Sequence, residues 1–325
     1  MAEGNFAPDA ARAGEAAAAL DHHLQQSFEH LAQACSARMT LDRCGIDRLA
    51  VRLAAGGVAH PAEYGIHFDL LDAIAAEDEP AILAGFRSLA NVTIDDWIVP
   101  LDARALGDSL AALYRRVIDA DDQRALALTA PPVGSVAAAG AQIAEGQALL
   151  RRIAPALAAE ARHLTRQIVL ATEAPDAAHP FYGGSSFFLW GGIFFNPQRH
   201  ATAYETAETL VHEAAHTLLT ALAREEPLVR NPRSARYQAP VRRDPRPMEG
   251  IYHATFVLSR TCLLHRTAAG ATDLTQPVRT AAAAAARRDT HLFFDGFATV
   301  MAQAELGELG RALIEDAARF VSDGA

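Results

Sequence analysis

The sequence TAETLVHEAAHTLLTAL, from Thr206 to Leu222, is the stretch from which the fold and the chemistry of this chain are best inferred. It contains the pattern H-E-x-x-H at His212, Glu213 and His216. On an α-helix, residues four positions apart lie on one face with their β-carbons about 5–6 Å apart. If this segment is helical, its two imidazoles can bind one metal ion.

The residues around the two histidines favour a buried helix. Leucine and valine side chains flank the pattern, and Ala214 and Ala215 are small enough for close packing. Buried imidazoles need polar partners, because burial without a partner is costly. We therefore interpret the segment from about Ala203 to Arg224 as a metal-binding helix, and not as a surface helix with two incidental histidines.

A third ligand is expected from later in the chain. The segment PRPMEGIYHATFVLSR offers Glu249 and His253, which are themselves four residues apart on a second predicted helix. We favour His253, which lies one turn inside the helix that begins near Gly250, and keep Glu249 as the alternative. The longer pattern H-E-x-x-H-x-x-G-x-x-H is absent, which argues against a metzincin peptidase.

An arginine-rich loop separates the two predicted ligand helices. The sequence RRDPRP, ending at Pro247, is stiffened by its prolines, so we expect a structured element. Such an element can direct Arg242 or Arg246 towards the metal, where a guanidinium binds a carboxylate through two parallel hydrogen bonds. The alternative is a purely structural pair between an arginine and Asp244.

The remaining sequence predicts a mainly helical chain with a few strands. Apolar residues at helical spacing, interrupted by glycine and proline, predict helices on both sides of the central motif. RQIVLATE is rich in apolar and β-branched residues and predicts a strand. SSFFLWGGIFFNP predicts a hairpin that turns at Gly191-Gly192. Two more segments are expected as single long helices, one over 138–165 and one from about Thr280 to the C-terminus.

These elements predict an α+β fold that is predominantly α-helical, with a small β-sheet and hairpin packed next to the H-E-x-x-H helix. We expect a mainly helical N-terminal part over residues 1–130 and a metal-binding catalytic part over 131–325. A single continuous domain is the alternative.

Composition narrows the class of protein. The chain has 325 residues and a formal net charge of -10, so it has no general attraction to nucleic acid or to anionic membranes. We find neither a long apolar run nor a secretory signal. Only three cysteines occur, which fits a reducing compartment. These features predict a cytoplasmic protein.

Together the motifs resemble a bacterial family, the HEXXH motif-containing peptide modification proteins. The resemblance is carried by LVHEAAHTLL and by PLVRNPRSARYQAPVRRDPRPMEGIYHATFVLSR, and it covers roughly residues 180–265. The combination of H-E-x-x-H, R-x-D-P-R-P and G-x-x-H is far more specific than the first motif alone. One departure is that Ala239-Pro240-Val241 stands where the family usually has a run similar to Ser-Pro-Trp.

This resemblance implies an Fe(II)- and 2-oxoglutarate-dependent hydroxylase of peptide side chains, acting on ribosomal precursor peptides in natural-product biosynthesis. It implies that His212, His216 and His253 hold the metal. It also implies that Arg242 or Arg246 binds the cosubstrate carboxylate. Imidazoles suit iron as well as zinc, so the ligand types alone do not choose the metal.

Three functions therefore compete. In the hydroxylase, Glu213 would orient a ligand or a water molecule. In a zinc metallopeptidase, Glu213 would be the general base, and Arg246, Tyr237 or Tyr252 would stabilise the oxyanion. In the third interpretation, the chain is a precursor-peptide-binding module without catalysis. A fixed cation for the cosubstrate favours the hydroxylase.

Overall fold

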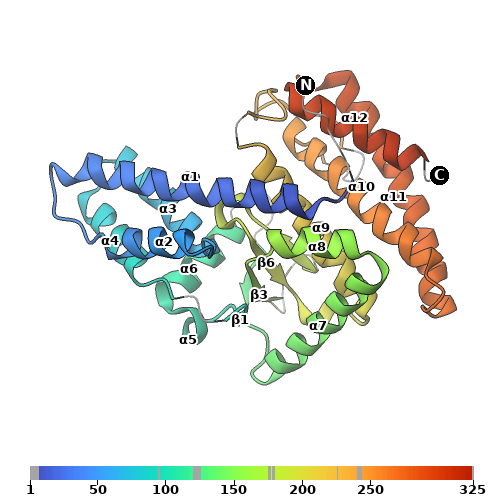
Figure 1. The fold of residues 1–325 in the computed structure, drawn as a ribbon, viewed down its shortest axis with the longest axis horizontal. Coiled ribbons are helices and arrows are strands. Elements are labelled where there is room, and N and C mark those ends of the chain that lie inside the picture. Colours follow the sequence, from blue (N-terminus) through green and yellow to red (C-terminus); the bar gives the residue numbers. More distant parts are fainter. Residues whose placement is uncertain are drawn as a thin grey trace. The chain divides into compact units, whose positions relative to one another are not determined.

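Helices make up most of the structure, a computed structural model shown in Figure 1. It describes residues 7–93, 96–119, 126–174, 177, 180–224, 226–239 and 244–323. Two small sheets accompany the helices. The predicted class, predominantly α-helical α+β, is confirmed.

Two compact units are built from segments that alternate along the chain. Unit 1 comprises Met1–Ala11, Glu145–Ala161 and Thr202–Ala325. Unit 2 comprises Arg12–Ala144 and Arg162–Ala201. Because each unit draws on separated segments, neither coincides with the consecutive parts expected from the sequence.

Unit 2 combines most of the N-terminal helices with both sheets. Its helices are α1 (Ala10–Ser36), α2 (Cys44–Ala54), α3 (Pro61–Ala75), α4 (Glu79–Ala90), α5 (Ala103–Leu106), α6 (Asp108–Ile118) and the first part of α7 (Ser135–Ile153), with the 3-10 helices η1 (Phe187–Leu189) and η2 (Pro197–Arg199). Its strands are β1 (Ile98–Pro100), β2 (Leu128–Thr129), β3 (Gln167–Leu170), β4 (Thr172–Glu173), β5 (Gly183–Ser185) and β6 (Gly192–Phe195). The strand predicted from RQIVLATE is present as β3 and β4.

The main sheet has the strand order β1-β3-β6-β5. Strands β1, β3 and β6 are parallel, with Ile168 opposite both Ile98 and Ile193. All four residues of β3 and all four of β6 are buried. A strand buried on both faces has a nearly continuous apolar sequence, which explains why these segments show no alternation.

The predicted hairpin is present in a different form. Strands β5 and β6 are an antiparallel pair, but the turn is not a two-residue turn at Gly191-Gly192. The aromatic residues Phe187–Leu189 form η1 and not a strand, because Ser186 caps this short helix by accepting a hydrogen bond from the backbone of Phe188 at 3.3 Å. Only Gly191 of the glycine pair has a positive φ, of 83°.

Helix α3 begins with a cap that uses a histidine. The Nδ1 atom of His60 accepts a hydrogen bond from the backbone N–H of Ala62 at 3.2 Å. In return, the Glu63 carboxylate accepts one from the backbone N–H of His60 at 2.7 Å. This reciprocal arrangement satisfies two backbone donors at the start of the helix, and Pro61 at the first helical position requires none.

Unit 1 consists of helices and of a non-helical segment between α9 and α10. It contains the end of α7, most of α8 (Pro155–Leu164), α9 (Ala203–Leu222), α10 (Met248–Gly270), α11 (Gln276–Gln303) and α12 (Glu308–Asp323). Helix α9 is the predicted H-E-x-x-H helix, and it starts at a capping box in which Thr202 and Glu205 bond each other's backbone N–H groups at 3.2 and 3.0 Å.

Two long helices expected from the sequence are each broken in two. Pro155 separates α7 from α8, because proline lacks an N–H and its ring crowds the preceding turn. Helices α11 and α12 are separated where the chain pairs with a distant segment: Arg230 donates to Glu305 at 2.7 Å and Gly307 donates to Leu228 at 3.0 Å. The expectation of one helix over each stretch was therefore wrong.

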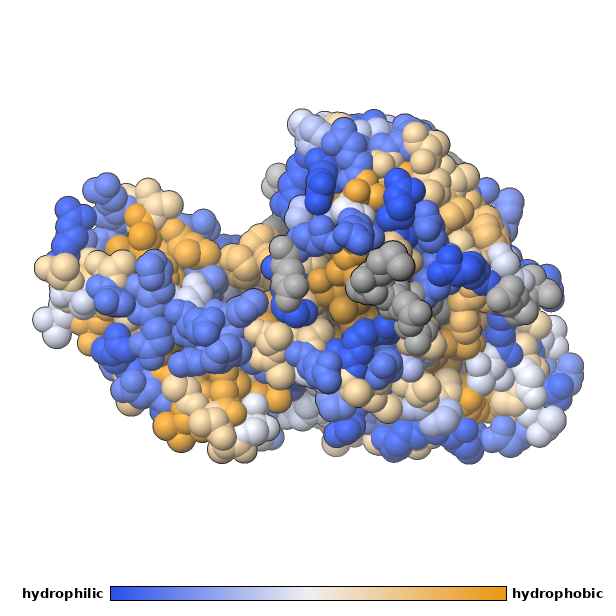
Figure 2. Space-filling view, turned by 45° about the horizontal axis from the view of Figure 1, so that its top comes forward, coloured by the Kyte–Doolittle hydropathy of each residue, from blue (hydrophilic) through white to orange (hydrophobic). Residues whose placement is uncertain are grey.

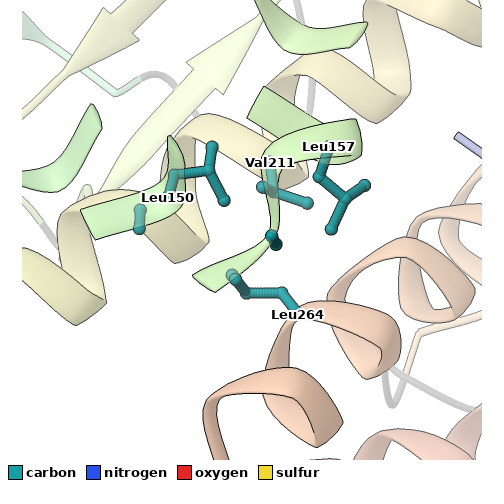
Figure 3. Packing of buried hydrophobic residues seen from close by; sticks show 6 residues of the cluster. Leu150, Leu157, Val211 and Leu264 are labelled. Atoms are coloured by element: carbon teal, nitrogen blue, oxygen red, sulfur yellow. The ribbon is translucent and has the colours of Figure 1, made fainter. Parts of the chain in front are cut away.

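One hydrophobic cluster of unit 1 joins α7, α8, α9 and α10. It consists of Leu150, Ala154, Leu157, Ala207, Val211 and Leu264. Figure 3 shows the side chains of Leu150, Leu157, Val211 and Leu264 converging from α7, α8, α9 and α10. Val211 directly precedes His212, so the packing that buries it also fixes the position of the first histidine.

The surface mixes polar and apolar residues. Figure 2 shows hydrophilic residues over much of one face, with apolar patches between them. Among the described residues, the large apolar side chains that are exposed include Val133, Phe187 and Tyr182. The helices of the described chain include none that is both long and apolar enough to cross a membrane.

Candidate metal centre

The three histidines predicted as ligands lie together. On α9 the ring centroids of His212 and His216 are 5.1 Å apart, as expected for residues one turn apart. The ring of His253, from α10, lies 6.1 Å from that of His216, and the two planes differ by 27°. The spacing of these residues in the sequence does not predict that α9 and α10 pack with the three rings close together.

Burial and mutual proximity keep two of these rings neutral. Burial lowers the pKa of His216 well below its usual range, and the neighbouring His212 and His253 lower it further. Burial also lowers the pKa of His253, with Glu249 opposing this effect and Arg233 adding to it. A neutral imidazole has a free lone pair on one ring nitrogen, which is the form that binds a metal.

A cavity of about 600 Å³ opens beside these rings. All three histidines line it, with residues of the arginine loop and one face of α10. The described lining residues other than histidine are Arg233, Ala239, Arg246, Pro247, Glu249, Gly250, Ile251, Ala254, Thr255, Val257 and Leu258. This volume is in the range of small-molecule binding sites.

Glu249, the alternative third ligand, is engaged in an ion pair. Its carboxylate accepts hydrogen bonds from the Arg233 guanidinium at 3.1 and 3.3 Å. The Glu249 side chain is 48% exposed, whereas His253 is half-buried next to His216. Of the two candidates, His253 is better placed to bind the same metal ion as the two histidines of α9.

Arg246 lines the same cavity. Its backbone is fixed by two hydrogen bonds with Tyr237, each 2.9 Å long, so this part of the arginine loop has a defined structure. The guanidinium lies 2.7 Å from the carboxylate of Asp244. The structural pair considered in the sequence is therefore formed, and it lies at the cavity. Arg242 is outside the described residues.

Glu213 occupies a different position from the histidines. It is 5% exposed and is not among the described residues that line the cavity. The two tyrosines considered for a peptidase are also not among them. The Tyr252 hydroxyl donates to the backbone oxygen of Gly310 at 2.8 Å, and that of Tyr237 accepts from Asn231 at 2.9 Å.

Two buried polar contacts position the helices that carry the histidines. Arg260 of α10 forms an ion pair with Glu160 of α8 at 3.2 Å, with the side chains 1% and 5% exposed. His265 of α10 contacts the Tyr204 hydroxyl of α9 at 2.5 Å and the Asp289 carboxylate of α11 at 3.3 Å. A buried charge without its partner is strongly destabilising, so these contacts restrict how α10 can pack.

The donor chemistry of the site fits a metal ion better than its present geometry does. Three imidazoles from two helices are a ligand set used for iron and for zinc. Within the described residues, however, no group of three or more His, Cys, Asp or Glu side chains is arranged to hold an ion as it stands.

Two features of the cavity were missed in the sequence. Arg233 was not singled out in the sequence, and Gly250 was considered only as the start of a helix. A helical count from His253 would have indicated part of the wall, because Gly250 and Val257 are three and four residues away on the same face.

Comparison with known proteins adds no assignment. No family model matches the chain, and no curated protein matches it.

Proposed function

We propose that this chain is an Fe(II)- and 2-oxoglutarate-dependent hydroxylase that modifies a side-chain carbon of a ribosomal precursor peptide. The observation that carries the proposal is the convergence of His212, His216, His253 and Arg246 on one cavity. A guanidinium in reach of a metal site suits a cosubstrate with two carboxylates.

Each group has a separate task in this proposal. The three imidazoles hold the metal, and burial keeps those of His216 and His253 in the neutral form that can bind it. When bound, iron and 2-oxoglutarate would supply, with dioxygen as the oxidant, the chemistry for hydroxylation: one oxygen atom enters the C–H bond of the peptide, and the other enters 2-oxoglutarate, which loses carbon dioxide to become succinate. Arg246 binds the carboxylate of 2-oxoglutarate that is remote from the metal. Because the guanidinium has five N–H donors, Arg246 can donate hydrogen bonds to Asp244 and to a second carboxylate at the same time.

The position of Glu213 bears on the choice of reaction. A general base must reach the proton that it removes, directly or through one water. Glu213 is buried and is not among the described residues at the cavity, so its position does not favour the zinc metallopeptidase. In the proposed hydroxylase, Glu213 supports the helix that carries the ligands.

Metal analysis of anaerobically purified protein tests this proposal. We expect stoichiometric iron after loading with Fe(II), and a new visible absorbance band when 2-oxoglutarate is added. Binding of zinc alone, with cleavage of peptides and no response to 2-oxoglutarate, would favour the peptidase. Absence of any metal binding would favour the binding module.

Substitution of Arg246 tests the cosubstrate site. Arg246→Lys keeps the charge but loses the two parallel hydrogen bonds, so 2-oxoglutarate should bind at least about tenfold more weakly, with metal content unchanged. Arg311→Lys is the matched control, because Arg311 is exposed on α12 and pairs with Glu315. Unchanged affinity for 2-oxoglutarate in both Arg246→Lys and Arg242→Lys would show that neither arginine binds the cosubstrate carboxylate.

A further inference from the structure

One face of α10 forms a wall of the cavity. The residues Gly250, His253, Ala254, Val257 and Leu258 follow the helical spacing of three or four and all line the cavity. Glu249, Ile251 and Thr255 of α10 also line the cavity, and Glu249 is held by Arg233. Beyond His253, a molecule lying along the wall therefore meets mainly the apolar side chains of Ala254, Val257 and Leu258.

Gly250 is not explained by the fold. It is helical and its φ is not among the positive values of this chain. A β-carbon added there would have no heavy atom within 4 Å in the part of the chain that the structure describes. Gly250 is exposed in the first turn of α10, and neither a positive φ nor a close contact among the described residues requires glycine there. What Gly250 does provide is space in the cavity, one turn from His253.

We infer that Gly250 is a specificity-determining residue, which leaves room beside His253 for an aliphatic side chain of the peptide substrate. This inference rests on the proposed function, since it names the substrate of the same site. Alanine, valine and leucine on the wall offer no hydrogen bond, so a charged substrate side chain would lose its hydration without compensation. Of the arginines at the cavity, Arg233 pairs with Glu249, and Arg246 is the residue that the proposed function assigns to the 2-oxoglutarate carboxylate.

Three small probes test this inference on metal-free protein: the N-acetyl amides of leucine, alanine and aspartate. Binding is followed through the histidine ring signals in NMR spectra, which need neither metal nor turnover. The leucine probe should shift the His253 signals and bind at least about tenfold more tightly than the aspartate probe. Equal affinity for leucine and aspartate would overturn the aliphatic assignment.

Variants at Gly250 test the role of the missing side chain. Gly250→Leu should weaken binding of the leucine probe at least about tenfold, and Gly250→Ala should weaken it less. Gly270→Leu is the matched control, because Gly270 also lies on α10 and also has no described heavy atom within 4 Å of an added β-carbon. Wild-type affinity in Gly250→Leu would overturn the inference. If thermal melting shows that Gly250→Leu does not fold, unchanged affinity in Gly250→Ala overturns it instead.

The outcomes separate this inference from the proposed function. If Gly250→Leu weakens binding of the leucine probe but the protein binds neither iron nor 2-oxoglutarate, the role of Gly250 in specificity would stand and the hydroxylase would be refuted. Iron and 2-oxoglutarate binding without any effect of Gly250→Leu on the leucine probe would refute the role of Gly250 and leave the hydroxylase intact.

Discussion

The positions of some residues of the site could be predicted from the sequence, and those of others could not. His212 and His216 are a helical pair by spacing alone, and their ring distance of 5.1 Å follows from it. His253 could only be chosen by its place in a second helix, since the sequence does not show how two helices pack. The pair of Arg246 with Asp244 was foreseen as an alternative, but not its place on the cavity wall.

Removal of the third ligand gives the first prediction. His253→Ala should abolish metal binding or reduce it strongly, because one of three protein ligands is lost. Glu249→Gln is the comparison, and it should retain metal because Glu249 pairs with Arg233 in the structure. Metal content by mass spectrometry and Zn(II) affinity by titration are the measurements. Retention of metal by His253→Ala, with loss in Glu249→Gln, would show that the ligand choice is wrong.

Glu213 gives the second prediction. Glu213→Gln keeps the size of this buried side chain and removes its charge. In the proposed hydroxylase, affinities for metal and for 2-oxoglutarate should be unchanged, with a smaller loss of turnover. A general base would be lost in a peptidase, at a cost on the order of 10²–10⁴-fold in rate. If the protein cleaves peptides and Glu213→Gln loses nearly all of that activity, the result would favour the zinc metallopeptidase.

At the scale of elements, the sequence was reliable where local chemistry decides. Helix α9 begins next to Thr202 because Thr202 and Glu205 form a capping box, which is a signal within four residues. The split at Pro155 was also visible in the sequence, but apolar spacing on both sides suggested one helix. The break between α11 and α12 could not be predicted, because it depends on pairing with the distant residues Leu228 and Arg230.

The short strands show the same limit. β1 and β2 contain three and two residues, too few for a periodic pattern to be recognised. β1 exists because it pairs with β3, so its structure is decided by a partner about seventy residues later. The aromatic run that became η1 was misassigned because apolar content was weighed above the cap that Ser186 provides.

The cap of α3 gives the third prediction. Burial, with a smaller effect of Arg52, lowers the pKa of His60 from 6.5 to about 4. Between these two values the unfolded chain binds a proton that the folded chain does not. The contribution of His60 to stability is therefore full above pH 6.5 and is lost as the pH falls towards 4. The maximum slope is about 1.4 kcal/mol per pH unit.

Denaturant unfolding of wild type and His60→Asn between pH 7 and pH 4 measures this effect. Asparagine retains an acceptor for the backbone N–H of Ala62 and does not titrate. Glu63 acts in the opposite direction, because burial raises the pKa of its carboxyl. The informative quantity is therefore the difference between the two proteins, and wild type should lose more stability on acidification. Parallel curves would contradict the prediction.

At the scale of the whole molecule, the candidate ligands all belong to unit 1. A metal ion that binds only the folded state stabilises it by about 2.7 kcal/mol at a hundredfold excess over Kd. That stabilisation should appear first in the helices that supply the ligands. The division into units was not visible in the sequence, because composition changes little where the chain passes from one unit to the other.

Hydrogen exchange with and without Zn(II) gives the fourth prediction. Amides of α9 and α10 should exchange more slowly with metal, by up to about a hundredfold, and by more than amides of α3 and α4 in unit 2. In His253→Ala the added metal should have little effect. An effect of Zn(II) confined to unit 2, or none in α9 and α10, would contradict a metal centre at these histidines.

The interleaved segments of the two units have a consequence for synthesis on the ribosome. Residues Glu145–Ala161, which pack against α9 and α10 in unit 1, emerge before the forty residues 162–201 that complete unit 2. The ion pair of Glu160 with Arg260, one hundred residues later, can therefore form only after α10 has been synthesised. A chain stopped near residue 230 can finish the sheet but not the metal-binding unit. The nascent protein thus acquires the cavity beside the three histidines after the sheet, once α10 has emerged from the ribosome.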